Sequence, residues 1–209
     1  IDRTDVPGLA GIHHADGALR ICALTTHRAV ERADLGPDFA VLSAPMRWVG
    51  HLPIRTRGTV GGSIAHGDAT AEWCLLAVLL DAVVVAEGRG GRLAVRAREF
   101  FLGPFTTALD PDEVMVEIVF PRPAPRAALT EYADRRGDFA VVAAGVDLGT
   151  GEVVLGGVGA VPVRVPDAGT PAEVADGLEL RDEAGIPAEY RRGLVRTLVA
   201  RAREEAARG

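Results

Sequence analysis

The residues between positions 58 and 67 combine glycines with small hydroxyl side chains, a pattern that could bind an anion. They are Gly58-Thr59-Val60-Gly61-Gly62-Ser63-Ile64-Ala65-His66-Gly67. Glycine lets the backbone approach a ligand closely, and consecutive backbone N–H groups in such a turn can form an anion-binding nest. Thr59 and Ser63 add hydroxyl donors. The segment is therefore compatible with a diphosphate, although Gly-Gly between small residues is more often only a tight turn.

Two common phosphate motifs are excluded by the residue types and their spacing. The Walker pattern needs a lysine, and the chain contains none, because arginine supplies every cationic side chain. The spacing also differs from the G-x-G-x-x-G pattern of dinucleotide-binding folds. The net charge of −6 argues against nucleic-acid binding, which usually requires a basic stripe.

The remaining reactive side chains do not form a catalytic or metal-binding pattern. Cys22 and Cys74 are not arranged as a C-x-x-C pair, so we expect two buried small side chains and no zinc or iron–sulfur site. We identify no metal ligands, general base or nucleophile. No apolar run reaches the ~18 residues of a membrane span, and no secretory signal is recognised. We therefore expect a cytoplasmic protein.

Turn residues and apolar spacing predict the elements around the glycine-rich segment. Residues 8–25 form a hairpin-like pattern whose turn we place at 13–17, and Thr25 or Thr26 caps a short helix through Glu31. A helix follows from Pro37 to Val49. After the predicted loop, a helix capped by Asp68 or Thr70 runs through Leu80.

The rest of the chain reads as strands, then a linker, then a second domain. Residues 83–86 and 93–96 pair across a glycine turn, and 114–120 form another strand. The proline-rich segment 121–125 predicts a boundary between domains at 1–122 and 126–209. Strands at 130–133, 139–148 and 153–161 form a three-stranded antiparallel sheet, packed against a helix capped at Thr170 and an amphipathic helix over 188–207. The fold class is α+β.

The glycine-rich segment and its flanks resemble a motif of a known family. Residues 54–66, Ile-Arg-Thr-Arg-Gly-Thr-Val-Gly-Gly-Ser-Ile-Ala-His, closely resemble the "(V/I)RNRGT(I/L)GG(N/S)(I/L)AH" segment of the FAD-binding subunits of molybdenum hydroxylases. That family includes the medium chain of aerobic carbon monoxide dehydrogenase and the flavin part of xanthine dehydrogenase. Asp68, Glu72 and Trp73 resemble the family's "D-x-x-x-E-(W/L)".

Further segments resemble the family in the same order along the chain. They lie at residues 1–12, 24–27, 100–109, 113–121, 131–140, 155–164 and 188–192. The resemblance thus spans essentially the whole chain. It implies the second part of a PCMH-type FAD-binding domain, followed by a C-terminal domain of the carbon monoxide dehydrogenase flavoprotein type.

The resemblance also implies which residues contact the cofactor. The family's "TxGG(N/S)" segment lies against FAD, and the acid of the next helix also binds it. A strand residue near Met115 touches the flavin side. The family often has a lysine near Glu131, where this chain has an acid, so we assign no contact there. The implied FAD contacts are Thr59, Val60, Gly61, Gly62, Ser63, Asp68, Glu72 and Met115.

The family's activity implies an electron-relay flavoprotein subunit. Its partners would be a large molybdenum-binding subunit and a small subunit with 2Fe-2S clusters, as a dimer of heterotrimers. Electrons would pass from those clusters to FAD and on to an external acceptor. An earlier "AGGT(D/S)" loop that wraps the FAD diphosphate in the family is absent from these residues, and we expect it N-terminal to Ile1. The alternatives are a structural member that no longer binds FAD, and a stand-alone flavin oxidoreductase.

Overall fold

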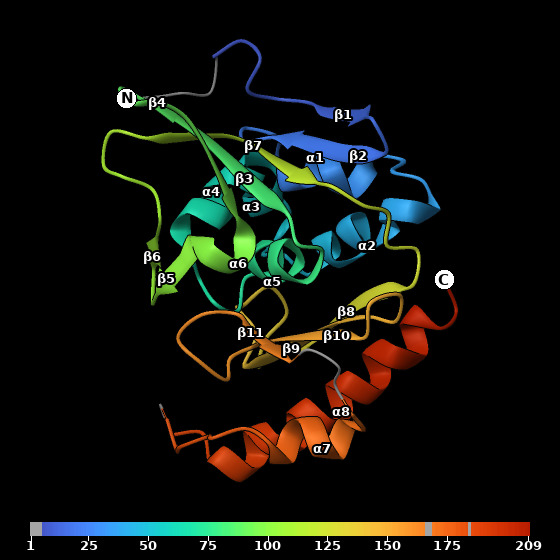
Figure 1. Cartoon of the computed structure of the whole chain (residues 1–209). Helices are drawn as coiled ribbons and strands as arrows, with labels where there is room; N and C mark the ends of the chain where they lie inside the picture. The colour runs from blue at the N-terminus through green and yellow to red at the C-terminus, as the bar shows by residue number, and fades with distance from the viewer. Residues whose placement is uncertain (1–5, 166–168, 184) are drawn as a thin grey trace.

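A five-stranded and a four-stranded antiparallel sheet organise the chain (Figure 1). The computed structural model describes residues 6–165, 169–183 and 185–209, so the Ile1-Asp2 part of the first matching segment lies outside the described residues. The five-stranded sheet has the order β1 (Ile12–Ala15), β2 (Ala18–Cys22), β7 (Val114–Phe120), β3 (Val83–Gly88) and β4 (Gly91–Arg96). Its strands all come from the chain before the predicted linker.

The four-stranded sheet comes from the chain after the linker. Its order is β11 (Val163–Val165), β10 (Glu152–Gly156), β9 (Val142–Asp147) and β8 (Ala127–Tyr132). The prediction of three strands is therefore wrong. The fourth strand, β11, has only three residues and follows the turns around Gly157 and Pro162, so no alternating pattern marks it. The predicted strand at 139–148 begins at Val142, and the one at 153–161 ends at Gly156.

Short helices lie between the two sheets and beside the five-stranded one. They are α1 (His27–Arg32), α2 (Ala40–Ser43), α3 (Leu52–Arg57), α4 (Val60–His66), α5 (Glu72–Leu79) and α6 (Ala97–Phe100), with 3₁₀ turns η1 (Pro37–Phe39) and η2 (Ala44–Arg47). A small ribbon pairs β5 (Phe101–Gly103) with β6 (Thr106–Thr107). On the outer face of the four-stranded sheet lie α7 (Pro171–Asp176) and α8 (Ala188–Ala206) (Figure 1).

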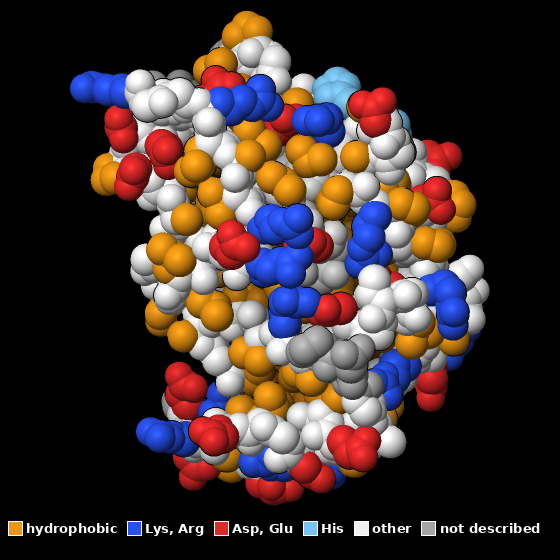
Figure 2. All heavy atoms as spheres, viewed as in Figure 1, with side chains coloured by type: hydrophobic (Ala, Val, Ile, Leu, Met, Phe, Trp, Pro, Cys, Tyr) orange, Lys and Arg blue, Asp and Glu red, His pale blue; other side chains and the backbone are white. Residues whose placement is uncertain are grey.

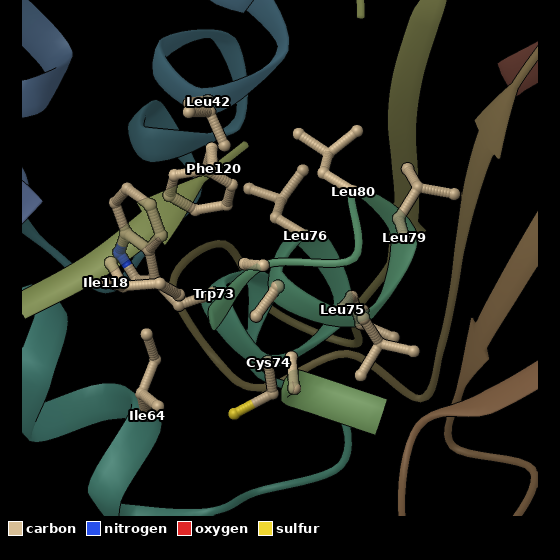
Figure 3. Packing of buried hydrophobic residues seen from close by; sticks show 14 of the residues in the cluster. Leu42, Ile64, Trp73, Cys74, Leu75, Leu76, Leu79, Leu80, Ile118 and Phe120 are labelled. Carbon is tan, nitrogen blue, oxygen red and sulfur yellow. The ribbon is translucent and has the colours of Figure 1, made fainter. Parts of the chain in front are cut away.

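Helix α5 is the centre of the larger core. Every one of its residues is buried, and Figure 3 shows its leucines and Trp73 pointing outward in several directions. This core joins side chains of both sheets, including Phe120 from the first and Val154 from the second. Burying one such large apolar side chain contributes about 1.5–3 kcal/mol, so α5 holds the two sheets against each other. A second core lies between the four-stranded sheet and α8, with Leu155 and Leu198 among its members.

Several local predictions are confirmed. Thr26 caps α1 through its side chain, and Thr170 and Glu173 form the capping box of α7. The linker predicted at 121–125 lies between β7 and β8. Its role as a domain boundary stays a prediction. One hydrophobic core contains residues from both sides of it.

Other local predictions are wrong for identifiable reasons. The first hairpin turns at Asp16 and Gly17, which both have positive φ, so His13 and His14 belong to β1. The helix predicted over 37–49 is divided into η1, α2 and η2, with Pro45 opening the last turn. Helix α5 begins after Ala71, because Asp68 bonds to the backbone and hydroxyl of Thr70 in the preceding turn.

The loop predicted at 58–67 is also wrong, since most of it is helix α4. Gly61 within it serves close packing between elements rather than an open turn.

Candidate functional site

The first turn of α4 uses its backbone N–H groups inside the protein. Val60 donates to the carbonyl of Thr25 at 2.9 Å, and Gly61 donates to that of Ala23 at 2.8 Å. The Thr59 side chain caps the helix by accepting from the Gly62 N–H at 3.1 Å. The Ser63 N–H bonds back to the Thr59 carbonyl. The predicted nest of free N–H groups is therefore not present in this conformation.

The two adjacent glycines of α4 have different roles. A Cβ atom on Gly61 would lie 2.5 Å from Cβ of Ala23 and 2.8 Å from its carbonyl oxygen, so only glycine lets α4 pack on the end of β2. A Cβ on Gly62 would meet only the Thr59 hydroxyl, at 3.0 Å. Gly62 and Ser63 face a cleft, whereas Val60 and Gly61 are buried against the sheet.

This cleft, of about 380 Å³, lies between the α1–α4 region and the loop that follows β8. Its volume is near the lower end of the ~300–1,000 Å³ typical of small-molecule sites. We call it the α4 cleft, and its lining residues are His27, Val49, Gly50, Ile54, Gly62, Ser63, His66, Glu72, Gly137, Asp138 and Phe139. The side chain of Phe139 is 58% exposed, so it offers a free aromatic face.

His27 enters the cleft as a neutral hydrogen-bond donor. Its Nδ1 accepts the indole N–H of Trp73 at 2.9 Å, so the neutral ring carries its proton on Nε2. Burial and the nearby Arg55 charge lower the pKa of His27 to about 4. Arg55 itself is held by Glu31 and by the carbonyl groups of Val49 and Gly50. The imidazole is therefore uncharged at neutral pH, with its Nε2–H available to a ligand.

Glu72 brings a buried carboxyl group to the same cleft. It is the first residue of α5 and is only 8% exposed. Burial, followed by the charge of Glu131, raises its pKa to about 8. Burial likewise raises the pKa of Glu131 to about 7. No ion pair among the described residues includes either carboxyl, and the hydrogen bond from the backbone of Glu72 to its own carboxylate only partly offsets the effect of burial.

The structure brings together some of the predicted contacts and not others. Gly62, Ser63 and Glu72 line the α4 cleft, and Thr59 caps the helix that presents them. Asp68 is occupied in the turn with Thr70. Met115 is buried in the hydrophobic core opposite Ala86 on β3 and does not line the cleft.

Sequence reasoning assigned no site role to His27, to Glu131 or to residues 137–139. Residues 137–139 lie far from α4 along the chain, and the packing of the two sheets brings them to the cleft. His27 is held beside α4 by the hydrogen bond from its backbone N–H to the carbonyl of Gly58. Glu131 does not line the cleft, but its charge acts on Glu72. The Thr25-Thr26-His27 and Gly137-Asp138-Phe139 segments were among the matches to the family, and that match was the available signal.

The surface carries mixed charge. In Figure 2, arginine and acidic side chains lie beside one another on the face shown. Asp81, for example, pairs with both Arg96 and Arg98. Within residues 6–165, 169–183 and 185–209, no helix is both long and apolar enough to cross a membrane.

Comparison with known proteins gives the same family over the whole chain. Residues 1–123 match the family model described as the FAD binding domain in molybdopterin dehydrogenase. The nicotine 6-hydroxylase medium subunit of Paenarthrobacter nicotinovorans is 32% identical over 232 residues, which cover 99% of this chain and 81% of that protein. The carbon monoxide dehydrogenase medium chain of Hydrogenophaga pseudoflava is 34% identical over 122 residues, 58% of this chain and 42% of that protein.

A solved structure extends the similarity to the fold. Quinoline 2-oxidoreductase from Pseudomonas putida 86 superposes with a TM-score of 0.86 at 29% identity, covering 100% of this chain and 81% of that one. The motif around α4, the family model and the fold therefore agree. The chain belongs to the FAD-binding medium subunits of the molybdenum hydroxylases, which are subunits of multi-subunit oxidoreductases.

Proposed function

We propose that this chain binds FAD with the isoalloxazine ring in the α4 cleft, and that it relays electrons between iron–sulfur clusters on a partner and an external acceptor. The observation that carries the proposal is the convergence of three family-matching segments on one cleft. Gly62 and Ser63 come from the first, Glu72 from the start of α5, and Phe139 from the loop after β8.

The lining of the α4 cleft fits an uncharged ring better than a diphosphate. Its lining residues include neither arginine nor lysine, and His27 is neutral. A diphosphate would meet Asp138 and Glu72 with no arginine or lysine in the lining to compensate its charge, and burying an unpaired charge is costly. A ring with carbonyl and nitrogen acceptors would instead meet donors such as the Ser63 hydroxyl and the His27 Nε2–H.

Each residue of the cleft has a separate task in this proposal. The Ile54 and Phe139 side chains supply apolar contact and exclude water from the ring. Ser63, His27 and protonated Glu72 orient it through hydrogen bonds. FAD, when bound, supplies the redox chemistry, and the protein supplies position and electrostatics. No side chain of this chain is required as a general base or nucleophile. Thr59, Val60 and Gly61 support the cleft by fixing α4.

The partners follow from the relatives and are part of the proposal. The relatives named above are medium subunits or chains of larger enzymes. We propose a large subunit with the molybdenum cofactor and a small subunit with 2Fe-2S clusters, assembled as a dimer of heterotrimers in the cytoplasm.

Titration of the purified chain with FAD, riboflavin and ADP tests the ring assignment. We expect FAD and riboflavin to bind with quenching of flavin fluorescence, and ADP to compete weakly or not at all. Gly62→Leu fills the cleft and should weaken riboflavin binding at least tenfold. Leu102→Ala, which removes an exposed apolar side chain outside the cleft, is the matched control and should bind like the unchanged chain.

Two results would contradict the proposal. If neither flavin binds, the α4 cleft of these residues is not a flavin site, and the alternative of a structural family member without FAD is favoured. If ADP binds as tightly as FAD and Gly62→Leu has no effect, the ring does not lie in the α4 cleft. Activity with an electron donor in the absence of any partner subunit would favour a stand-alone flavin oxidoreductase.

A further inference from the structure

The position of Glu131 on its sheet directs its side chain toward α5. Antiparallel partners share a face, and Glu131 pairs with Ala143, which belongs to the core around α5. The neighbouring Thr130 points the other way and donates its hydroxyl hydrogen to the carbonyl of Leu198 on α8. Side chains alternate along a strand, so Glu131 faces the layer that contains Glu72.

One row of residues across the sheet fixes where α5 begins above it. Gly156 on β10 pairs with Ala143 on β9, which pairs with Glu131 on β8. A Cβ on Gly156 would lie 2.8 Å from the carbonyl oxygen of Ala69, just before α5. Adjacent strands are about 4.8 Å apart, so Glu131 lies within about 10 Å of that contact. The start of α5, with Glu72, therefore lies over the row that ends in Glu131.

Most of the surroundings of these two carboxyls disfavour charge, and only the hydrogen bond from the backbone of Glu72 to its own carboxylate acts in the other direction. Glu72 faces Asp68 from the preceding turn, and Asp138 and His66 line the same cleft. The facing residues Ala143 and Gly156 carry no charge. Arg55, the cation whose charge reaches His27, is held by Glu31. Burial raises the pKa of both Glu72 and Glu131, to about 8 and about 7. Two electrostatically coupled carboxyls without a cation lose their protons in separate steps.

We propose that Glu72 and Glu131 form an electrostatically coupled carboxyl pair that retains a proton at neutral pH, and that this proton makes the α4 cleft select uncharged, acceptor-bearing rings over anions. A protonated carboxyl donates a hydrogen bond, whereas an ionised one only accepts. Removing the proton would therefore take away one hydrogen-bond donor to the ligand and place two negative charges beside it. The ring selectivity rests on the proposed flavin site, but the retained proton is a property of the chain without ligand.

Carboxyl titration of the ligand-free chain tests the pair directly. With ¹³C-labelled glutamate, NMR should show two glutamate side chains that titrate above pH 6. Glu72→Gln and Glu131→Gln each remove one of these two signals and so assign them. Glu131→Gln should lower the midpoint of Glu72, because the like charge is removed, and Glu72→Gln should lower that of Glu131. Glu179→Gln, at an exposed position, is the control and should move neither midpoint. Ordinary glutamate midpoints for both residues, or no response of Glu72 to Glu131→Gln, would overturn the pair.

Riboflavin affinity from pH 6 to pH 9 tests the selectivity. We expect about a fivefold to tenfold loss of affinity as the proton leaves, which corresponds to one hydrogen bond, and a smaller loss in Glu131→Gln. An unchanged affinity across this range overturns the selectivity. Absence of riboflavin binding at every pH, with the carboxyl midpoints as expected, overturns the proposed flavin site and the selectivity but supports the pair.

Discussion

Replacement of Gly61 by alanine should push α4 away from the end of β2. The added Cβ would lie 2.5 Å from Cβ of Ala23, whereas carbon atoms in contact are about 3.5–4.0 Å apart. The nearest atoms belong to the backbone and Cβ of Ala23, so no flexible side chain can move aside. The same shift would lengthen the hydrogen bonds that Gly61 and Val60 donate to Ala23 and Thr25.

The magnitude follows from three terms. Overpacking costs about 1–3 kcal/mol, and weakening one or two hydrogen bonds adds about 1–2 kcal/mol. Alanine is favoured over glycine inside a helix by about 1 kcal/mol. The free energy of unfolding should therefore fall by about 1–4 kcal/mol, with a central value near 2.5. At about 2–4 °C per kcal/mol for a protein of this size, the Tm should fall by about 5–10 °C.

The matched control is the neighbouring glycine. Gly62→Ala places its Cβ against only the Thr59 hydroxyl, and it gains the same helix propensity, so its stability should stay within about 1 kcal/mol of the unchanged chain. Urea unfolding followed by circular dichroism measures both variants. Equal stability of Gly61→Ala and Gly62→Ala would refute the argument that Gly61 is required for close packing of α4.

Three further predictions concern buried polar groups and a helix cap. Trp73→Phe leaves the Nδ1 of His27 without its donor and should cost about 1–3 kcal/mol in urea unfolding, and an unchanged stability would mean that the hydrogen bond is dispensable. Burial raises the pKa of Glu72 from its ordinary 4.5 to about 8, so the folded state holds a proton that the unfolded chain releases. Stability should therefore fall as pH rises between those values, by at most about 1.4 kcal/mol per pH unit, and Glu72→Gln should flatten a denaturation series over pH 5–8. If the stability of Glu72→Gln falls with pH as steeply as that of the unchanged chain, the pH dependence belongs to other groups. Thr170→Ala removes the capping box of α7 and should lower the stability by about 1 kcal/mol, and the absence of any loss would show that α7 is held by packing alone.

Features that depend on neighbouring residues were predictable from the sequence. Thr26 and Thr170 cap their helices through bonds to residues three positions away, so the signal and its effect lie in one short window. The strand pair β3–β4 and its glycine turn are local in the same sense.

Features that depend on distant contacts were not predictable. Glycines usually mark turns, but Gly61 is part of a helix because Ala23, nearly forty residues earlier, leaves no space for a Cβ atom. The short strand β11 exists only through pairing with β10. Phe139 reaches the candidate site, and Glu131 faces the layer that contains Glu72, because α5 packs on the second sheet, and no local pattern encodes that packing.

The location of the isoalloxazine ring is the most direct test of the account. Backbone amide NMR of the labelled chain, titrated with riboflavin at pH 6, would map the bound ring. We predict saturable shifts at Gly62, Ser63, Glu72 and residues 137–139, with little change around the separate pocket that Trp48 and Ala124 line. Saturable shifts centred on that other pocket, or no saturable shifts in the α4 cleft, would contradict the proposed flavin site.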